Sequence, residues 1–335
     1  MSGFAPWQAA AFEGAVRAFE QGRLGHALLL VGPPHMGKQA VAEELARRML
    51  CGSPRGDGFA CGRCRSCQLF GAQKVGLATM QAHADLQRIG LEPNDKGDKL
   101  RTEITVDQVR RLGEWFSLTA QFGGAQVAIV EPADLMNHQA ANALLKTLEE
   151  PAANRFLLLV TSRPGRLPAT IRSRCQRIEF PLPPPSEALA WLQARGFSDA
   201  DAGSGLAAAR DNPGLAAAWL ADGSLALRDD VRKQLRAVAA DKAGVVETAQ
   251  LWLADDKGEL RLRFAADLAL ELGARGLGAM TGVEEPAGGA ARFPGLARWF
   301  DAINRTREQL RSPLRNDLVL AGLLREWRNM FQAAR

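Results

Sequence analysis

The chain has 335 residues, of which 47% are hydrophobic and 24% charged, and 42 Lys and Arg against 37 Asp and Glu give a net charge of +5. This length and composition are typical of a globular protein with two or three domains, and they exclude intrinsic disorder, a collagen-like repeat and a disulfide-stapled miniprotein. Aromatic residues make up only 6% of the chain, without tyrosine, which argues against a single-strand binder built on base stacking.

The sequence shows no signal for a membrane or for secretion. No apolar run approaches the roughly 18 residues of a spanning helix. The N-terminal segment lacks a basic stretch followed by an apolar one. We therefore expect a cytoplasmic protein without a membrane partner.

Residues 1–182 alternate between helical and strand patterns. Apolar residues have helical spacing around residues 10–19 and 38–50, and the apolar segment 26–32 is typical of a buried strand. After a cysteine-rich stretch follow a helix at about 105–120, a strand at 126–131, a helix at 137–150 and strands at 155–162 and 174–180. This alternation predicts an α/β domain whose parallel sheet is covered by helices on both faces.

The remainder of the chain shows only helical patterns. A proline-rich break at 181–186 marks the first boundary, and a Gly-rich linker is expected around residues 273–290. We predict three domains: an α/β domain (1–182), a small helical domain (183–225) and a larger helical domain (226–335).

The segment from Gly32 to Lys38 has the G-x-x-x-x-G-K pattern of a phosphate-binding loop. It follows a predicted strand and opens a predicted helix, where glycines let backbone N–H groups approach phosphate oxygens and the lysine reaches the outer phosphates. Gly32, Gly37 and Lys38 are therefore candidate nucleotide-binding residues. The alternative is a Gly/Pro turn with a surface lysine.

Two positions of this motif depart from a working ATPase. Gln39 stands where a Ser or Thr hydroxyl should hold magnesium, and a carboxamide is a poor substitute ligand. After the strand at 126–131, adjacent carboxylates are expected, but the chain has Glu131 followed by Pro132. We expect no useful ATP hydrolysis, while weak binding of ATP or ADP stays open.

Four cysteines have the spacing C-x9-C-x2-C-x2-C, at Cys51, Cys61, Cys64 and Cys67. Two-residue gaps let successive thiolates converge on one ion, and four sulfurs without an open position describe a structural Zn²⁺ site. Reduced cysteines in a loop and an iron–sulfur cluster are the alternatives.

Several arginines lie between the strands at 155–162 and 174–180. They form either a solvated basic helix or a group that projects into the phosphate site of a neighbouring subunit, where an arginine stabilises charge during phosphoryl transfer.

The segment N-A-L-L-K-T-L-E-E-P (Asn142–Pro151), the motif Ser173-Arg174-Cys175 and the four-cysteine insert resemble bacterial sliding-clamp loaders of the AAA+ class. The resemblance is specific over roughly residues 20–182. With Gln39 and Pro132, and with Asp211-Asn212-Pro213-Gly214 in place of a Gly-Ser-x-Arg sensor, the chain is most similar to a non-hydrolysing, stator-type subunit of that family.

The resemblance implies an AAA+ P-loop NTPase-like domain with a zinc-binding insert, a helical lid and a C-terminal helical collar. It implies that Arg174 is an arginine finger acting in trans on a neighbour's ATP. It also implies that Thr161 or Ser162 falls at a phosphate-sensing position, although a strand-end cap suits a chain that does not hydrolyse. The implied partners are motor subunits of gamma/tau type and a delta-type subunit within the DNA polymerase III holoenzyme, and through the assembly the sliding clamp and the backbone of primed DNA.

Two other functions compete with this interpretation. A self-sufficient ATPase motor of the same loader would have to use Gln39 and Glu131. A zinc-dependent nucleic-acid-binding module would bind DNA through residues 48–75. The clamp-loader resemblance itself implies contact with the DNA backbone through helix N-termini and scattered arginines such as Arg110 and Arg111, which are also typical of a solvated helix face.

Overall fold

The computed structural model describes residues 3–71, 83–94, 96–122, 124–278, 289–309 and 316–332. It divides into two compact units, residues 1–218 and 219–335. The predicted boundaries after residues 182 and 225 stay predictions. Within the described residues, no helix combines the length and apolarity needed to span a membrane.

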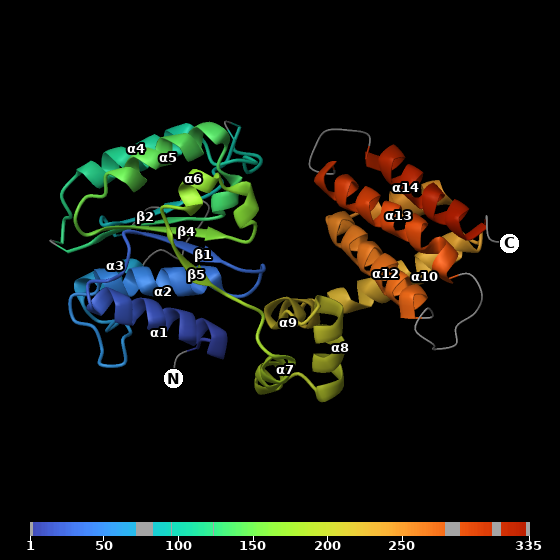
Figure 1. The fold of residues 1–335 in the computed structure, drawn as a ribbon, viewed down its shortest axis with the longest axis horizontal. Coiled ribbons are helices and arrows are strands. Elements are labelled where there is room, and N and C mark those ends of the chain that lie inside the picture. The colour runs from blue at the N-terminus through green and yellow to red at the C-terminus, as the bar shows by residue number, and fades with distance from the viewer. Residues whose placement is uncertain are drawn as a thin grey trace. The chain divides into compact units, whose positions relative to one another are not determined.

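The first unit is built on one parallel sheet (Figure 1). Its strands are β1 (Ala27–Val31), β2 (Leu86–Ile89), β3 (Gln126–Val130), β4 (Arg155–Thr161) and β5 (Gln176–Glu179), in the spatial order β2-β3-β4-β1-β5. The register pairs Val31 with Thr161 and Val130 with Leu159. The expected α/β class with a parallel sheet is confirmed.

Helices cover both faces of the sheet, as the alternating pattern predicts (Figure 1). The helices on one face are α1 (Pro6–Glu20), α2 (Lys38–Leu50) and α3 (Arg65–Gly71). Those on the other face are α4 (Val106–Ser117), α5 (His138–Glu149) and α6 (Ala169–Arg172), with single turns η1 (Ala133–Leu135) and η2 (Pro164–Arg166). The unit continues with α7 (Pro185–Ala194), α8 (Asp199–Ala209) and the start of α9 (Pro213–Ala221).

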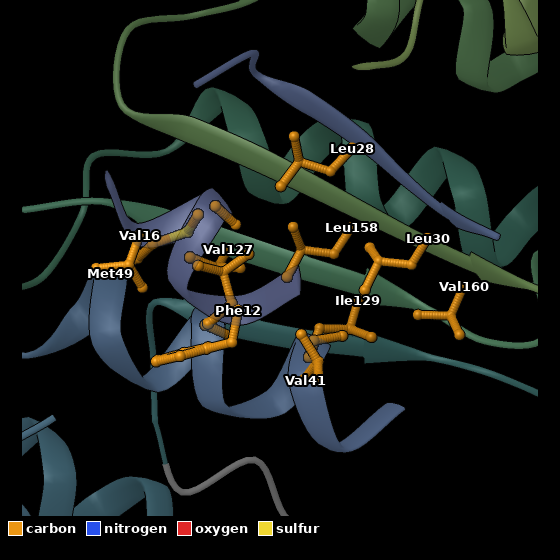
Figure 2. Close-up of a cluster of buried hydrophobic side chains, with 14 of the residues drawn as sticks. Phe12, Val16, Leu28, Leu30, Val41, Met49, Val127, Ile129, Leu158 and Val160 are labelled. Carbon is orange, nitrogen blue, oxygen red and sulfur yellow. The ribbon is translucent and has the colours of Figure 1, made fainter. Parts of the chain in front are cut away.

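Each face of the sheet has its own core. Figure 2 shows the cluster beneath α1 and α2, where Phe12 and Val41 pack against Leu30 and Leu158. On the opposite face, Leu29 and Leu159 pack against α4 and α5. Both faces of β1 are therefore buried, which explains its unbroken apolar sequence.

Local signals set the helix ends. Asn137 caps α5 by accepting a hydrogen bond from the Ala140 N–H (2.8 Å), and Thr105 opens α4 with Gln108 as its capping-box partner. Pro151 follows α5, since proline cannot continue a helix.

The sequence interpretation missed two elements. Strand β2 lies at an edge of the sheet, and its central Gln87 and Arg88 are only half-buried, so it lacks the apolar run that marks the other strands. Helix α3 lies inside the cysteine-rich stretch.

The second unit was predicted to be helical, and every regular element in its described part is a helix. These helices are α10 (Ser224–Ala239), α11 (Val245–Leu253), α12 (Gly258–Gly278), α13 (Gly289–Gln309) and α14 (Asn316–Gln332). Buried tryptophans join them: the Trp299 indole N–H donates to the Leu323 carbonyl (2.8 Å) and that of Trp327 to the Leu235 carbonyl (2.9 Å).

The predicted linker at 273–290 is wrong at its ends. Residues 273–278 belong to α12 and residues 289–290 to α13. The rest of the predicted linker lies outside the described residues.

Leu29→Ala tests the doubly covered sheet. Leu29 is fully buried on β1, so truncation should lower the free energy of unfolding by about 2–5 kcal/mol through lost burial and a residual cavity. Leu118→Ala, at a side chain that is 60% exposed, should change it by less than about 0.5 kcal/mol. Urea denaturation measures the free energy of unfolding of each variant, and hydrogen exchange of the β1 and β4 amides reports the local stability of the sheet. Equal losses of stability in Leu29→Ala and Leu118→Ala would contradict this packing.

Candidate functional site

The candidate nucleotide-site residues gather at the carboxyl ends of three strands. Gly32 follows β1, Glu131 follows β3, and Thr161 ends β4. Strand β1 lies between β4 and β5, whereas the next strand in the chain, β2, is at the far edge. Ligands of open parallel sheets bind outside the carboxyl ends of strands where the strand order reverses in this way.

Both loop glycines are required by the backbone. A Cβ atom on Gly32 would lie 2.5 Å from the carbonyl oxygen of Phe180, at the end of β5. Gly37 has φ of +79°, in the left-handed region, and a Cβ there would overlap the Gln8 carboxamide. The loop therefore keeps the close approach and the left-handed turn that place its lysine at the start of α2.

Lys38 points back into this loop. Its ammonium donates to the carbonyls of Gly32 (2.8 Å) and Pro33 (2.6 Å) and to the Ser162 hydroxyl (3.0 Å). Burial lowers the pKa of Lys38 to about 8, against the opposing effect of Glu131 and Asp134. The side chain is thus mostly charged at neutral pH, at the position from which a phosphate-loop lysine acts.

The carboxylates of the site are less suited to bind magnesium than the loop is to bind phosphate. Burial raises the pKa of Glu131 to about 7, because it outweighs the attraction of Lys38. Asp134 accepts a hydrogen bond from the Thr161 hydroxyl (2.6 Å), whose oxygen also accepts the Arg163 N–H (2.9 Å). Thr161 thus makes the bonds of a strand-end cap. Gln39 is exposed in the first turn of α2.

Two further elements hold the loop. From α1, the side chains of Trp7 (3.2 Å) and Gln8 (3.1 Å) both donate to the Met36 carbonyl. The Asn212 carboxamide donates to the Pro34 carbonyl (2.9 Å) and accepts from the Leu215 N–H (3.0 Å) at the start of α9.

Gly214 completes this contact between α9 and the loop. It packs against the His35 carbonyl so closely that no Cβ would fit. The segment proposed to replace the sensor motif is therefore bound directly to the tip of the phosphate loop.

Arg174 follows α6 and is placed by two bonds. Its Nη2 forms an ion pair with Glu149 Oε1 (2.8 Å) at the end of α5, and its Nη1 donates to the Thr170 carbonyl (3.0 Å). The side chain is 38% exposed. The guanidinium is thus anchored on one side and reachable from solvent.

The structure brings the four predicted metal ligands together. The sulfurs of Cys51, Cys61, Cys64 and Cys67 all lie within 4.8 Å of one another. The Cys51–Cys64 and Cys61–Cys67 sulfur pairs are each 3.9 Å apart, and the edge of a ZnS₄ tetrahedron with Zn–S near 2.3 Å is about 3.8 Å. Backbone N–H groups of Arg63 and Cys64 donate to the Cys61 sulfur and lower its pKa to about 6, which favours the thiolate. The cluster fits one tetrahedral ion.

A buried polar chain connects this cysteine module to the sheet. Ser66, on α3, donates to the Leu50 carbonyl (2.7 Å) and contacts His83 Nε2 (2.6 Å). His83 Nδ1 accepts the Asp85 N–H (3.1 Å), just before β2. This pattern makes Nε2 the protonated nitrogen that donates to Ser66. The burial of His83 lowers its pKa and favours this neutral form.

The sequence offered Thr161 or Ser162 for one position, and it is Ser162 that contacts Lys38. Sequence reasoning missed Gln8 and His83, which act from positions far from the motifs they support and which no local spacing indicates. Asn212 was named within the segment that replaces the sensor, but its contact with Pro34 was not expected. Asn212 followed by Pro213 did carry one signal, that of a helix N-cap.

Comparisons with known proteins matched a family model and several curated proteins. The model described as "DNA polymerase III, delta subunit" matches residues 7–184, which include the phosphate loop, the cysteines and Arg174. Over 199 residues the chain is 42% identical to DNA polymerase III subunit delta' of Pseudomonas aeruginosa, covering 59% of this chain and 55% of that protein. Over 188 residues it is 42% identical to the delta' subunit of Escherichia coli strain K12, covering 56% and 52%.

Solved structures also match the chain at low identity. The gamma subunit-related protein of DNA polymerase III from Thermotoga maritima is 17% identical, with a TM-score of 0.44 over 96% of this chain and 99% of that one. By contrast, the chain spans about half the length of the curated relatives it matches.

Cys64→Ser tests the metal site. Removal of one of four thiolates should lower the zinc content of the purified protein by at least half and increase protease cleavage around residues 51–67, because metal binding and local folding are linked. Cys175→Ser, at the buried cysteine outside the cluster, should leave zinc content unchanged. Elemental analysis with limited proteolysis measures both, and unchanged zinc and protease resistance in Cys64→Ser would refute the site.

Glu131→Gln tests the buried carboxyl. The pKa of Glu131 is near 4.5 in the unfolded chain and about 7 in the fold. As the pH rises through this range, the folded carboxyl must ionise while buried, so its contribution to the free energy of unfolding falls. Between pH 4.5 and pH 8, the free energy of unfolding of Glu131→Gln should therefore rise relative to that of wild type by about 1–2 kcal/mol, after discounting for solvent screening. Urea denaturation at both pH values measures the gain. Glu103→Gln, at an exposed carboxyl, is the control, and an equal gain in both variants would contradict the burial of Glu131.

Proposed function

The chain belongs to the DNA polymerase III delta-subunit family, and we propose that it is a delta-prime-type, non-hydrolysing subunit of the clamp loader of DNA polymerase III. In this role it supports an assembly that uses ATP in neighbouring subunits to place a sliding clamp on primed DNA. The names of the relatives from Pseudomonas aeruginosa and Escherichia coli support the subunit assignment.

The observation that carries the proposal is Gln39. The loop before it keeps its glycines, its turn and a charged lysine, so the backbone still has the form of a phosphate cradle. A working loop then needs a hydroxyl to hold magnesium against the phosphates. Gln39 offers a longer carboxamide from an exposed position, and hydrolysis without that metal contact is not supported.

The acidic side supports the same conclusion. Glu131 is followed by Pro132, whose side chain has no group that could orient the attacking water. With a pKa near 7, Glu131 is also protonated in a large fraction of molecules at neutral pH. We infer that nucleotide binds weakly or not at all, and without turnover.

Arg174 is proposed to act on a neighbour. An arginine that stabilises transferring phosphate must reach beyond its own domain, and the partly exposed guanidinium of Arg174 meets that condition. The C-terminal helical unit would serve as the collar that joins the subunits, and the cysteine module would hold a structural Zn²⁺. The protein would act in the cytoplasm with the replication machinery, near the primed DNA backbone.

A motor subunit is the alternative, because Gly32, Gly37 and Lys38 retain the geometry of a phosphate loop. A motor and a stator differ in which residue of this chain the ATPase rate of the assembly requires. A motor needs its own Lys38, whereas a stator needs only its Arg174.

The DNA- and clamp-stimulated ATPase of a reconstituted loader separates the two. Arg174→Ala should remove a large share of the rate, at least about tenfold at the one site it completes, since such arginines contribute large factors to phosphoryl transfer. Lys38→Ala should change the rate by less than about twofold.

Arg172→Ala is the matched control, because this exposed arginine lies two residues before Arg174. It should behave as wild type, and assembly of each variant is checked by size-exclusion chromatography. Loss of rate with Lys38→Ala but not with Arg174→Ala would establish a motor and overturn the proposal.

A further inference from the structure

The contact between Arg174 and Glu149 joins two segments that the sequence interpretation treated separately. Glu149 is the last residue of α5, and Arg174 follows α6, 25 positions later. Their ion pair of 2.8 Å is accompanied by the bond from Arg174 Nη1 to the Thr170 carbonyl (3.0 Å). The two acceptors hold the two terminal nitrogens of one guanidinium.

The location of Glu149 does not favour its own helix. The carboxyl end of a helix carries partial negative charge, so a carboxylate there is destabilising and a cation is preferred. The pair is also exposed, at 38% for Arg174 and 50% for Glu149, and exposed ion pairs contribute little to folding. Glu149 therefore contributes little to the stability of the fold, and a role for it must be functional.

The geometry of the pair leaves the arginine usable. A guanidinium presents several N–H donors in one rigid plane, which is why it suits phosphate. One bond to Glu149 and one to Thr170 fix the orientation of that plane, and these two bonds leave further N–H groups of this partly exposed side chain unused. A flexible arginine would lose conformational freedom on reaching a phosphate, whereas an oriented one has already lost it.

We propose that Glu149 is the positioning residue for Arg174: its carboxylate orients the guanidinium toward the nucleotide phosphates bound by a neighbouring subunit. The proposal rests on the proposed function, in which Arg174 acts in trans. Glu149 itself touches no nucleotide and acts only through Arg174.

The test uses the assembled loader and its DNA- and clamp-stimulated ATPase. Glu149→Gln keeps the shape of the side chain and removes its charge, and should lower kcat about three- to tenfold while KM for ATP changes less than twofold. Glu150→Gln is the matched control, since it removes the adjacent carboxylate at the same helix end, and it should match wild type. Glu149→Asp, which keeps the charge, should recover part of the loss.

A double-variant cycle distinguishes positioning from a general structural effect. If Glu149 acts through Arg174, then Glu149→Gln should have no further effect on kcat in the Arg174→Ala background. A merely structural role would give losses that multiply, with lower thermal stability of the chain in both backgrounds.

The outcomes distinguish failure of the positioning role of Glu149 from failure of the proposed function. If Arg174→Ala leaves the rate unchanged, the proposed function fails, and Glu149 has nothing to position. If Arg174→Ala lowers the rate but Glu149→Gln and Glu150→Gln both match wild type, or the cycle gives multiplying losses, only the positioning role of Glu149 is overturned.

Discussion

The hydrogen bonds of the phosphate loop are the constraint on which the first unit depends. The carbonyls of Gly32 and Pro33 accept from Lys38, that of Pro34 from Asn212, and that of Met36 from Trp7 and Gln8. These donors come from α1, from α2 and from the start of α9. Met36 is buried, and a buried carbonyl is costly to leave unpaired. The loop thus binds three separate segments.

This constraint explains why the form of the loop does not depend on a bound nucleotide. Gly37 must be left-handed, Gly32 must lie against Phe180, and Gly214 must lie against His35 whether or not nucleotide binds. The glycines are required by packing alone, whereas no contact of the loop described above depends on a hydroxyl at position 39 or a carboxylate at position 132. Intact glycines and lysine in such a motif are evidence of architecture and not of turnover.

The sequence predicted well wherever burial was two-sided or a motif was contiguous. β1, β3 and β4 were found from their apolar runs, α2 from its spacing, and the cysteine cluster from its two-residue gaps. β2 was missed because an edge strand with Gln87 and Arg88 at its centre has no such run. The contacts of Asn212 with Pro34 and of Ser66 with His83 depend on tertiary packing, and no pattern within a local window contains them.

The same logic separates Lys38, which follows β1 at the carboxyl ends of the strands, from Arg174, which precedes β5 at their amino ends. Lys38 is buried, has protein acceptors for its ammonium and supports the loop from within. Arg174 is partly exposed, and its guanidinium is oriented by Glu149 and Thr170 at the end of a short helix. A cation enclosed by its own loop stabilises that loop, whereas a cation held at the surface can interact with a negative charge on another molecule. The difference in burial therefore separates a lysine that supports its own loop from an arginine whose charge is accessible at the surface.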